Sequence, residues 1–189
     1  MNSTAYTLSI VDTLTEVDAN RWQSLAAANP FVGYHYLRLL QETGCVHARH
    51  GWYARYLLLH EADELVGAVP CFFKTHSRGE YVFDQGWAQA FAQHGLDYYP
   101  KLLVASPFTP VQGPRLLAAS PQARQALAQG LRQLCEEFQA SSVHTLFVQA
   151  DDLLALQQAG FMVREGVQFH WRNHGYDCVE SFLAKLSQD

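Results

Sequence analysis

The sequence predicts a mixed α/β fold in which a mostly antiparallel central sheet is flanked by helices. Three observations predict it: strand-like and helix-like segments interleave, two adjacent strands form an early hairpin, and a long amphipathic helix precedes a strand–helix–strand unit. A content of 49% hydrophobic and only 16% charged residues fits a substantial buried core. We therefore expect a single domain over residues 1–189.

The first half of the chain begins with a strand and two helices, and the hairpin follows. Apolar periodicity and the breaker Asn29-Pro30 define the first helix, and an acidic turn separates the two hairpin strands. The expected elements are strand Tyr6–Val11, helix Asp18–Ala28, helix Val32–Thr43, strands Tyr53–His60 and Leu65–Lys74, and a short helix Gly86–His94.

The second half contains the clearest helix. Ser120 is the expected N-cap, Pro121 stands where proline is tolerated, and apolar residues follow at helical spacing as far as Phe138. The other expected elements are strand Lys101–Ala105, a short strand or loop at Arg115–Ala118, a buried strand Val143–Val148, a strand Phe161–Trp171 and a helix Val179–Leu186.

The stretch from Val143 to Tyr176 reads as strand, helix, Gly-Phe, strand. Asp151 or Asp152 can cap the helix, and Gly160 is expected to end it in the left-handed conformation. This unit resembles the C-terminal part of the GNAT acyltransferase fold, where it forms one wall of the acyl-CoA cleft. The order of elements alone is shared by many α/β proteins.

Composition and charge argue against several partners. The net charge of -5 and the scattered Arg and Lys residues disfavour nucleic acid or an anionic membrane as the main partner. No run reaches the ~18 apolar residues that span a bilayer, and the start, MNSTAYTLSIVD, lacks the features of a signal peptide. Four cysteines far apart in the chain indicate a reducing, cytoplasmic compartment without disulfides.

Four long motifs carry a family resemblance. They are KTHSRGEYVFDQGWAQAF, YYPKLLVASPFTPVQGPRLL, SSVHTLF and GFMVREGVQFHWRNHGY. They resemble the FemAB-like family of predicted bacterial N-acyltransferases of the GNAT superfamily, described as related to peptidoglycan biosynthesis or recognition. The resemblance implies a GNAT-like domain. It also implies that this chain corresponds to the N-terminal half of longer proteins, in which a second GNAT-like module follows.

The resemblance also implies an acyl donor, either acyl-CoA or an aminoacyl-tRNA, although the residues fix no cofactor. GNAT enzymes bind the CoA pyrophosphate with a Gly-containing signature at a helix start. The matching stretch here, Arg115 to Ser120, keeps the arginine but has Ala118 for the first glycine, so an ordinary capped helix is the favoured interpretation. Leu156 occupies the position where GNAT enzymes often place a tyrosine as general acid.

Polar residues within the motifs form the predicted site, because they fall at strand ends or in loops where side chains can converge. Gln168 and His170 share one face of the last predicted strand. The candidates for the catalytic base are Glu80, His76 and His170. The predicted substrate-binding residues are Tyr98, Tyr99, Lys101, Thr109, Arg115, Arg164 and Gln168. The alternative is that these residues are dispersed over the surface or pair locally.

Two functions from different classes fit these residues. The first is acyl or aminoacyl transfer to an amine, linked to peptidoglycan precursors. The second is a non-catalytic module with a GNAT-like fold that recognises a peptide or precursor. No metal is predicted, because the histidine pairs His47/His50 and His170/His174 fall short of four convergent ligands.

Overall fold

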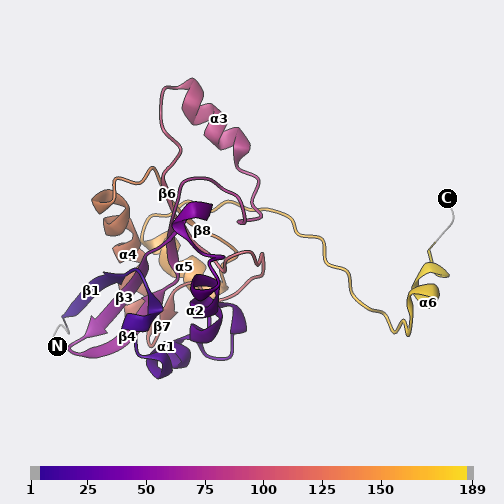
Figure 1. The fold of residues 1–189 in the computed structure, drawn as a ribbon, viewed down its shortest axis with the longest axis horizontal. Helices are drawn as coiled ribbons and strands as arrows, with labels where there is room; N and C mark the ends of the chain where they lie inside the picture. The colour runs from indigo at the N-terminus through magenta and orange to yellow at the C-terminus, as the bar shows by residue number, and fades with distance from the viewer. Residues whose placement is uncertain (1–4, 187–189) are drawn as a thin grey trace.

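A computed structural model describes residues 5–186 (Figure 1). It confirms the mixed α/β class and the mostly antiparallel pairing. The elements are β1 (Tyr6–Val11), α1 (Ala19–Ala26), α2 (Tyr34–Glu42), β2 (Trp52–Ala54), β3 (Tyr56–Glu61), β4 (Glu64–Val69), β5 (Cys71–Lys74), α3 (Gln85–Gln93), β6 (Lys101–Val104), β7 (Leu117–Ala118), α4 (Pro121–Glu137), β8 (Val143–Thr145), α5 (Ala150–Gln158) and α6 (Val179–Leu183).

The strands form two four-stranded sheets, and this corrects the expectation of one central sheet. The orders are β1-β3-β4-β7 and β2-β5-β6-β8, and only β6 with β8 is a parallel pair. The predicted hairpin passes from one sheet to the other, because Arg55 separates β2 from β3 and Pro70 separates β4 from β5. Pro70 has no N–H to donate to the ladder, so regular pairing stops there. One bond, from the Arg55 N–H to the Cys71 carbonyl at 2.8 Å, crosses the junction.

Helices cover both faces of the first sheet, so the strands of the hairpin are apolar on both sides. Tyr56 and Leu58 on β3 pack in one cluster with side chains of α1 and α2. Leu57 and Leu59 alternate with them and pack against α4 and α5 in a second cluster. This two-sided burial explains why Leu65–Lys74 reads as a continuous apolar run.

The long helix α4 begins as predicted. Ser120 caps it, with its Oγ accepting a hydrogen bond from the Ala123 N–H at 3.1 Å, and Pro121 occupies the first turn. The following strand is shorter and less buried than predicted. β8 ends at Thr145, and residues 143–148 are only half-buried because β8 lies at the edge of its sheet.

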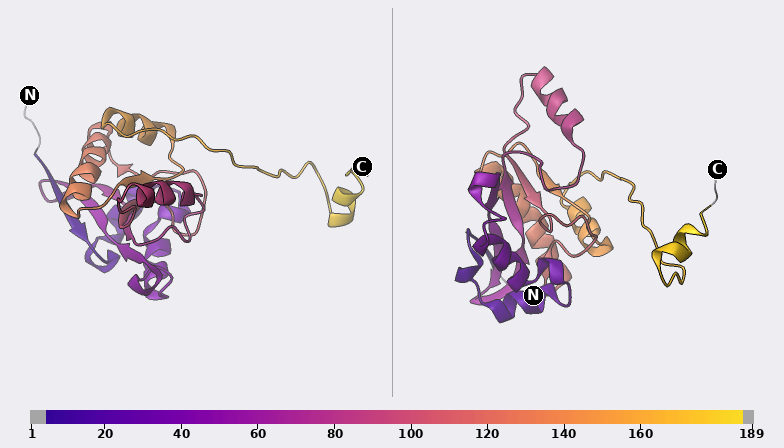
Figure 2. Two further views of the ribbon diagram at one scale, coloured as in Figure 1. Left: turned by 90° about the horizontal axis from the view of Figure 1, so that it is seen from above. Right: turned by 45° about the vertical axis from the view of Figure 1, so that its right-hand side comes forward.

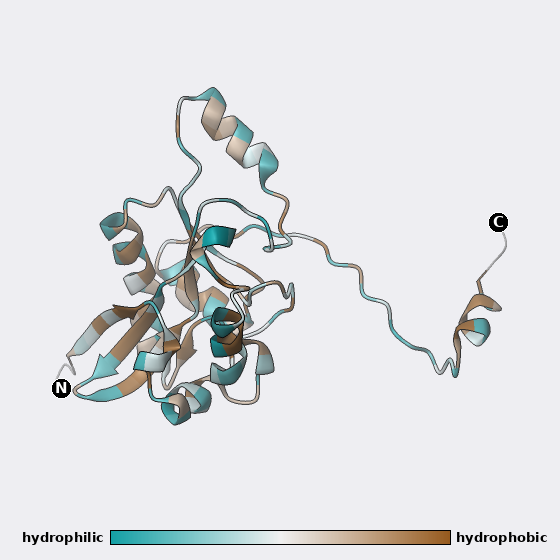
Figure 3. Ribbon diagram, in the orientation of Figure 1, coloured by the Kyte–Doolittle hydropathy of each residue, from teal (hydrophilic) through white to brown (hydrophobic). Residues whose placement is uncertain are grey.

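The predicted strand Phe161–Trp171 is wrong. Among the described residues, this segment pairs with no strand, and it runs away from the body toward α6 (Figures 1 and 2). Met162 and Phe169 are each 97% exposed, so the segment buries almost none of its apolar surface. Much of α6 is also hydrophobic and lies apart from the body (Figure 3). Alternating apolar residues predict a strand only where a neighbouring strand is present to pair with them.

A second feature that stands off the body is the arm of residues 75–100, which carries α3 (Figure 1). None of the α3 side chains is fully buried, and Phe83 and Trp87 are exposed. The base of the arm is held by β5 and β6, which pair with each other. In the described part of the chain, no helix is both long and apolar enough to cross a membrane.

Candidate functional site

The centre of the candidate site is the ammonium group of Lys101, at the start of β6. Lys101 Nζ lies 2.8 Å from Glu80 Oε2 and 2.6 Å from Asp84 Oδ2, and it donates to Ser77 Oγ at 2.8 Å. Ser77, Glu80 and Asp84 all come from the loop that leaves β5, so the loop closes over the strand end. We call Ser77, Glu80, Asp84, Tyr98 and Lys101 the Lys101 cluster.

The cluster is buried. Lys101 is fully buried, and Glu80 and Asp84 are 4% and 1% exposed. Tyr98 donates its hydroxyl to Asp84 Oδ2 at 2.9 Å, and Ser77 donates to the same oxygen at 2.7 Å. The second carboxylate oxygens, Glu80 Oε1 and Asp84 Oδ1, are buried without a hydrogen-bond partner among residues 5–186. A buried acceptor without a donor is costly, so these two oxygens are the unsatisfied polar atoms of the cluster.

The two carboxyl groups of the cluster differ in pKa. Burial raises the pKa of Glu80, although the charge of Lys101 opposes the shift. For Asp84, burial also acts to raise the pKa, but the hydrogen bonds from Lys101 and Ser77 outweigh it and the net shift is downward. One carboxyl group therefore ionises readily and the other holds its proton more tightly, as in pairs that divide acid and base roles.

A second buried lysine, Lys74 at the end of β5, faces Lys101 across the strand pair. Its Nζ lies 3.6 Å from the ring centroid of Trp52 and donates to the Arg78 carbonyl at 3.2 Å. Burial lowers the pKa of Lys74 to about 7, with Glu80 opposing the shift and Lys101 adding to it. Lys74 therefore titrates near neutral pH.

The structure brings four of the ten predicted site residues together. Glu80, Tyr98 and Lys101 belong to the cluster, and the Tyr99 hydroxyl lies 2.8 Å from Ser77 Oγ. His76 lies beside the cluster in an open pocket of about 440 Å³. Burial, followed by the charges of Lys74 and Arg78, lowers the pKa of His76.

The remaining five predicted residues lie elsewhere. The Thr109 hydroxyl forms a hydrogen bond with the Tyr36 hydroxyl of α2 at 2.9 Å. Arg164, Gln168 and His170 belong to the segment that leaves the body; Gln168 donates to the Pro110 carbonyl at 2.8 Å, and Arg164 reaches the Phe83 carbonyl at 3.4 Å. These contacts connect the segment to the two loops that border the site, but they do not bring His170 to Glu80.

Arg115 is fully buried and its guanidinium is used internally. It donates to the backbone carbonyls of Leu146, Pro114 and Val111 at 2.8, 3.0 and 2.6 Å. The prediction that Asp151 or Asp152 caps α5 is wrong. Gln149 is the N-cap of α5, and Asp152 instead accepts the Arg115 and Leu116 N–H groups at 2.6 and 3.2 Å. Arg115 and Asp152 therefore fasten the segment before β7 to α5.

The predicted set omits three residues that the geometry makes central: Ser77, Asp84 and Lys74. Asp84 occupies the N-cap position of α3 but makes no capping bond, so its carboxylate is free to face Lys101. A lysine that ends an apolar strand ordinarily reaches solvent, and nothing in the sequence indicates that Lys74 turns toward Trp52 instead. Among residues 5–186, no group of three His, Cys, Asp or Glu side chains is arranged to hold a metal.

One comparison with known proteins identifies a family. The FemAB-like family model, described as peptidoglycan biosynthesis/recognition, matches residues 13–189. No match was found among curated proteins.

Solved structures resemble the chain only distantly. Ribosomal-protein-alanine N-acetyltransferase from Brucella melitensis has 15% identity and a TM-score of 0.48, covering 89% of this chain and 99% of its own. TTHA1254 from Thermus thermophilus has 18% identity and a TM-score of 0.46, covering 89% and 98%. An aminoglycoside 6'-N-acetyltransferase from Acinetobacter haemolyticus has 13% identity and a TM-score of 0.46, covering 88% and 98%.

Proposed function

This chain belongs to the FemAB-like family, and we propose that it is an N-acyltransferase module that transfers an acyl or aminoacyl group to an amine of a peptidoglycan precursor. The observation that supports this chemistry is the state of Glu80. Its Oε2 is held by Lys101, whereas its Oε1 is buried and has no partner in the described part of the chain. A fixed carboxylate with one free oxygen suits a general base.

In the proposed reaction, Glu80 Oε1 accepts a proton from the acceptor amine. The amine nitrogen then bonds to the acyl carbon, and the ester or thioester bond of the donor breaks. The proton passes from Glu80 to the leaving oxygen or sulfur, which balances the step. Burial raises the pKa of Glu80 and so makes it a stronger base than an exposed glutamate. Lys101 is a positioning residue that holds the carboxylate.

The surroundings of Arg115 argue against CoA bound at the start of α4. Arg115, the residue that matches the CoA signature, donates to three backbone carbonyls, and Ser120 already satisfies the Ala123 N–H. Pro121 removes a further donor. We expect acetyl-CoA to bind weakly or not at all. Isothermal titration that gave a low-micromolar dissociation constant, about -8 kcal/mol, would contradict this.

We further propose that a second GNAT-like module packs against the segment 162–186. This segment carries exposed apolar side chains and two polar contacts to the site loops. A module covering it would place His170 and Arg164 in a shared groove. Limited proteolysis of this chain alone and of the two-module protein tests the point, since cleavage within 162–178 should be fast only in the former.

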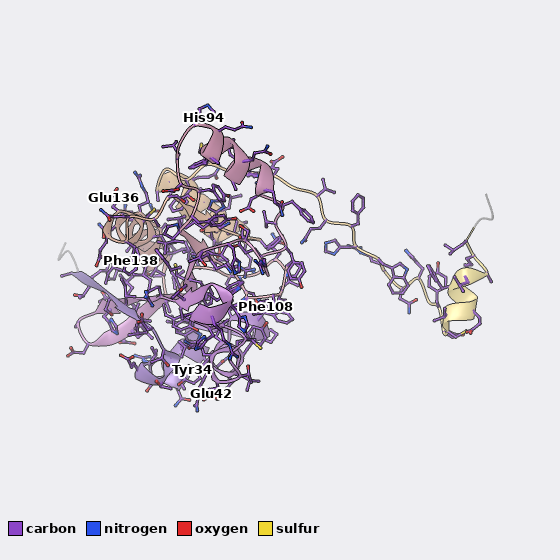
Figure 4. The ribbon with its side chains drawn as sticks, turned by 45° about the horizontal axis from the view of Figure 1, so that its top comes forward. Tyr34, Glu42, His94, Phe108, Glu136 and Phe138 are labelled. Atoms are coloured by element: carbon purple, nitrogen blue, oxygen red, sulfur yellow. The ribbon has the colours of Figure 1, made fainter. Side chains whose placement is uncertain are left out.

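The direct test of the proposed function compares Glu80→Gln with Glu136→Gln. Glu136 is an exposed residue of α4 and serves as the matched control (Figure 4). Each protein is incubated with acyl-CoA or aminoacyl-tRNA and with a peptidoglycan precursor amine, and the products are analysed by mass spectrometry. We expect transfer to fall at least 100-fold in E80Q and to stay unchanged in E136Q. Equal activity of both variants refutes Glu80 as the base.

The alternative function is recognition without catalysis, and one observation favours it. Leu156, at the position where related folds place a tyrosine acid, is 4% exposed and belongs to the apolar core around α4. No ionisable group can act from there. If the wild-type protein binds a precursor but forms no acylated product with either donor, the recognition function replaces the transfer function.

A further inference from the structure

The open pocket beside the Lys101 cluster has a charge pattern unlike that of the chain as a whole. Its lining residues are Cys45, Arg49, His50, Trp52, His76, Arg78, Gly79 and Phe108. They include two arginines and two histidines but no carboxylate, in a chain whose net charge is -5. Among residues 5–186, neither Arg49 nor Arg78 forms a salt bridge with Asp or Glu. The pocket is therefore a local site of positive potential.

The backbone is shaped to form this pocket. Gly51 and Gly79 adopt positive φ angles of 67° and 82°. A Cβ on Gly51 would lie 2.5 Å from His76 Nε2, and one on Gly79 would lie 2.7 Å from the Phe108 ring. Glycine at both positions lets the turn before β2 and the loop after β5 approach the side chains of the pocket.

The apolar wall of the pocket comes from two aromatic rings. Trp52 and Phe108 lie 5.0 Å apart between centroids, and Phe108 is at the surface with 36% of its area exposed (Figure 4). Lys74 Nζ also lies over the ring of Trp52. Phe108 itself has a φ of 58°, which is unfavourable for a side chain of its size, and its N–H donates to the Gly79 carbonyl. The ring of Phe108 is thus held over the pocket and available to a ligand.

We propose that this pocket binds a small phosphorylated ligand, with its phosphate between Arg49 and Arg78 and its ring or apolar part against Phe108. Guanidinium groups bind phosphate oxygens through paired N–H donors, and they remain charged at all relevant pH values. A volume of about 440 Å³ is within the range of small-molecule sites. A nucleoside diphosphate has both required parts.

The two histidines accept hydrogen bonds from the two arginines of the same site. The Arg78 N–H donates to His76 Nδ1 at 3.2 Å, so His76 has Nε2 for its own proton. Arg49 Nε donates to His50 Nε2 at 3.1 Å, which orients the guanidinium beside the pocket. This binding does not depend on acyl transfer, and the E80Q variant is expected to keep it.

The test is isothermal titration of the full chain with ADP, UDP, pyrophosphate and uncharged uridine at low salt. Three variants are compared with the wild type: Arg49→Met with Arg78→Met combined, Phe108→Ala, and Arg38→Met, a partly exposed control on α2 that does not line the pocket. We expect the double arginine variant to lose at least 30-fold in affinity for ADP, UDP and pyrophosphate, and R38M to change less than twofold. Circular dichroism melting verifies that each variant is folded.

Phe108→Ala separates the two halves of the proposal. It should weaken ADP and UDP several-fold and leave pyrophosphate unchanged, because only the nucleosides contact the ring. The proposal is overturned if the wild-type chain shows no saturable binding of any phosphorylated probe. It is also overturned if the double arginine variant binds as tightly as the wild type, since the anion then binds elsewhere.

Discussion

Lys74 and Lys101 are paired residues on β5 and β6, and both are fully buried, yet their surroundings are opposite. Lys101 has two carboxylates and a serine hydroxyl within 2.8 Å. Lys74 has one backbone carbonyl and the ring of Trp52, its partner on β2. The loop that follows β5 places Glu80 and Asp84 in contact with Lys101.

The comparison shows that partners, more than burial, decide what a buried lysine does. Glu80 and Asp84 compensate the charge of Lys101, so this ion cluster fastens the base of the α3 arm to β6. Among residues 5–186, Lys74 forms no salt bridge, and burial lowers its pKa to about 7 although the charge of Glu80 opposes the shift. On one face of the sheet the molecule therefore has an ion-paired lysine and, next to it, a lysine that can lose its proton near neutral pH.

The largest expected difference is in stability after each lysine is replaced by methionine. Lys101→Met leaves Glu80 and Asp84 buried without their cation, and we expect the free energy of unfolding to fall by about 3–5 kcal/mol. At pH 7, Lys74→Met removes a cation without a salt-bridge partner and should change the free energy of unfolding by less than about 1 kcal/mol. Urea denaturation of both variants provides the measurement. Equal decreases in the free energy of unfolding would show that the carboxylate partners of Lys101 do not distinguish it from Lys74.

Much of the fold could be predicted because local patterns and tertiary neighbours agree. The cap at Ser120 and the helical spacing after it depend on residues within one element, and α4 forms as expected. The strand Phe161–Trp171 fails because its pattern requires a neighbour that the described chain does not supply. Pro70 has no N–H to donate, yet the predicted strand Leu65–Lys74 runs across it. That the chain forms two sheets in place of one depends on how the whole hairpin bends.

The site could be predicted only in part, for a related reason. Glu80, Tyr98 and Lys101 were recognisable as polar residues at strand ends, and the structure brings them together. The strand register that places Lys74 opposite Lys101 is set by the whole sheet, and no local sequence pattern indicates it. Arg115 shows the reverse case, since its position beside a helix start suggests anion binding while backbone carbonyls occupy its donors.

The next largest effect is a pH dependence that Lys74 alone should confer. Its pKa is 10.5 ordinarily and about 7 in the folded chain, so between those values the unfolded chain holds a proton that the folded chain has released. Stability should therefore increase with pH, by at most about 1.4 kcal/mol per pH unit, and this contribution should be constant below pH 7.

The measurement is the difference in unfolding free energy between the wild type and K74M at pH values from about 7 to 9. Subtraction removes the groups that titrate in both proteins. We expect the difference to grow with pH in favour of the wild type. A difference that is flat over this range would mean that Lys74 stays protonated when folded, and burial would then not have lowered its pKa.

The smallest expected effect concerns the hydroxyl groups around the Lys101 cluster. The Tyr98 hydroxyl donates to Asp84 Oδ2, a charged acceptor that also accepts hydrogen bonds from Lys101 and Ser77. Tyr98→Phe should therefore lower the free energy of unfolding by about 1–2 kcal/mol. The Tyr99 hydroxyl meets only the neutral Ser77 Oγ, and Tyr99→Phe should cost less than about 1 kcal/mol. Thermal and urea unfolding of the two variants compare a charged with a neutral acceptor at adjacent residues. If Tyr99→Phe costs as much as Tyr98→Phe, the carboxylate does not strengthen its hydrogen bonds, and the contrast between Lys101 and Lys74 has another cause.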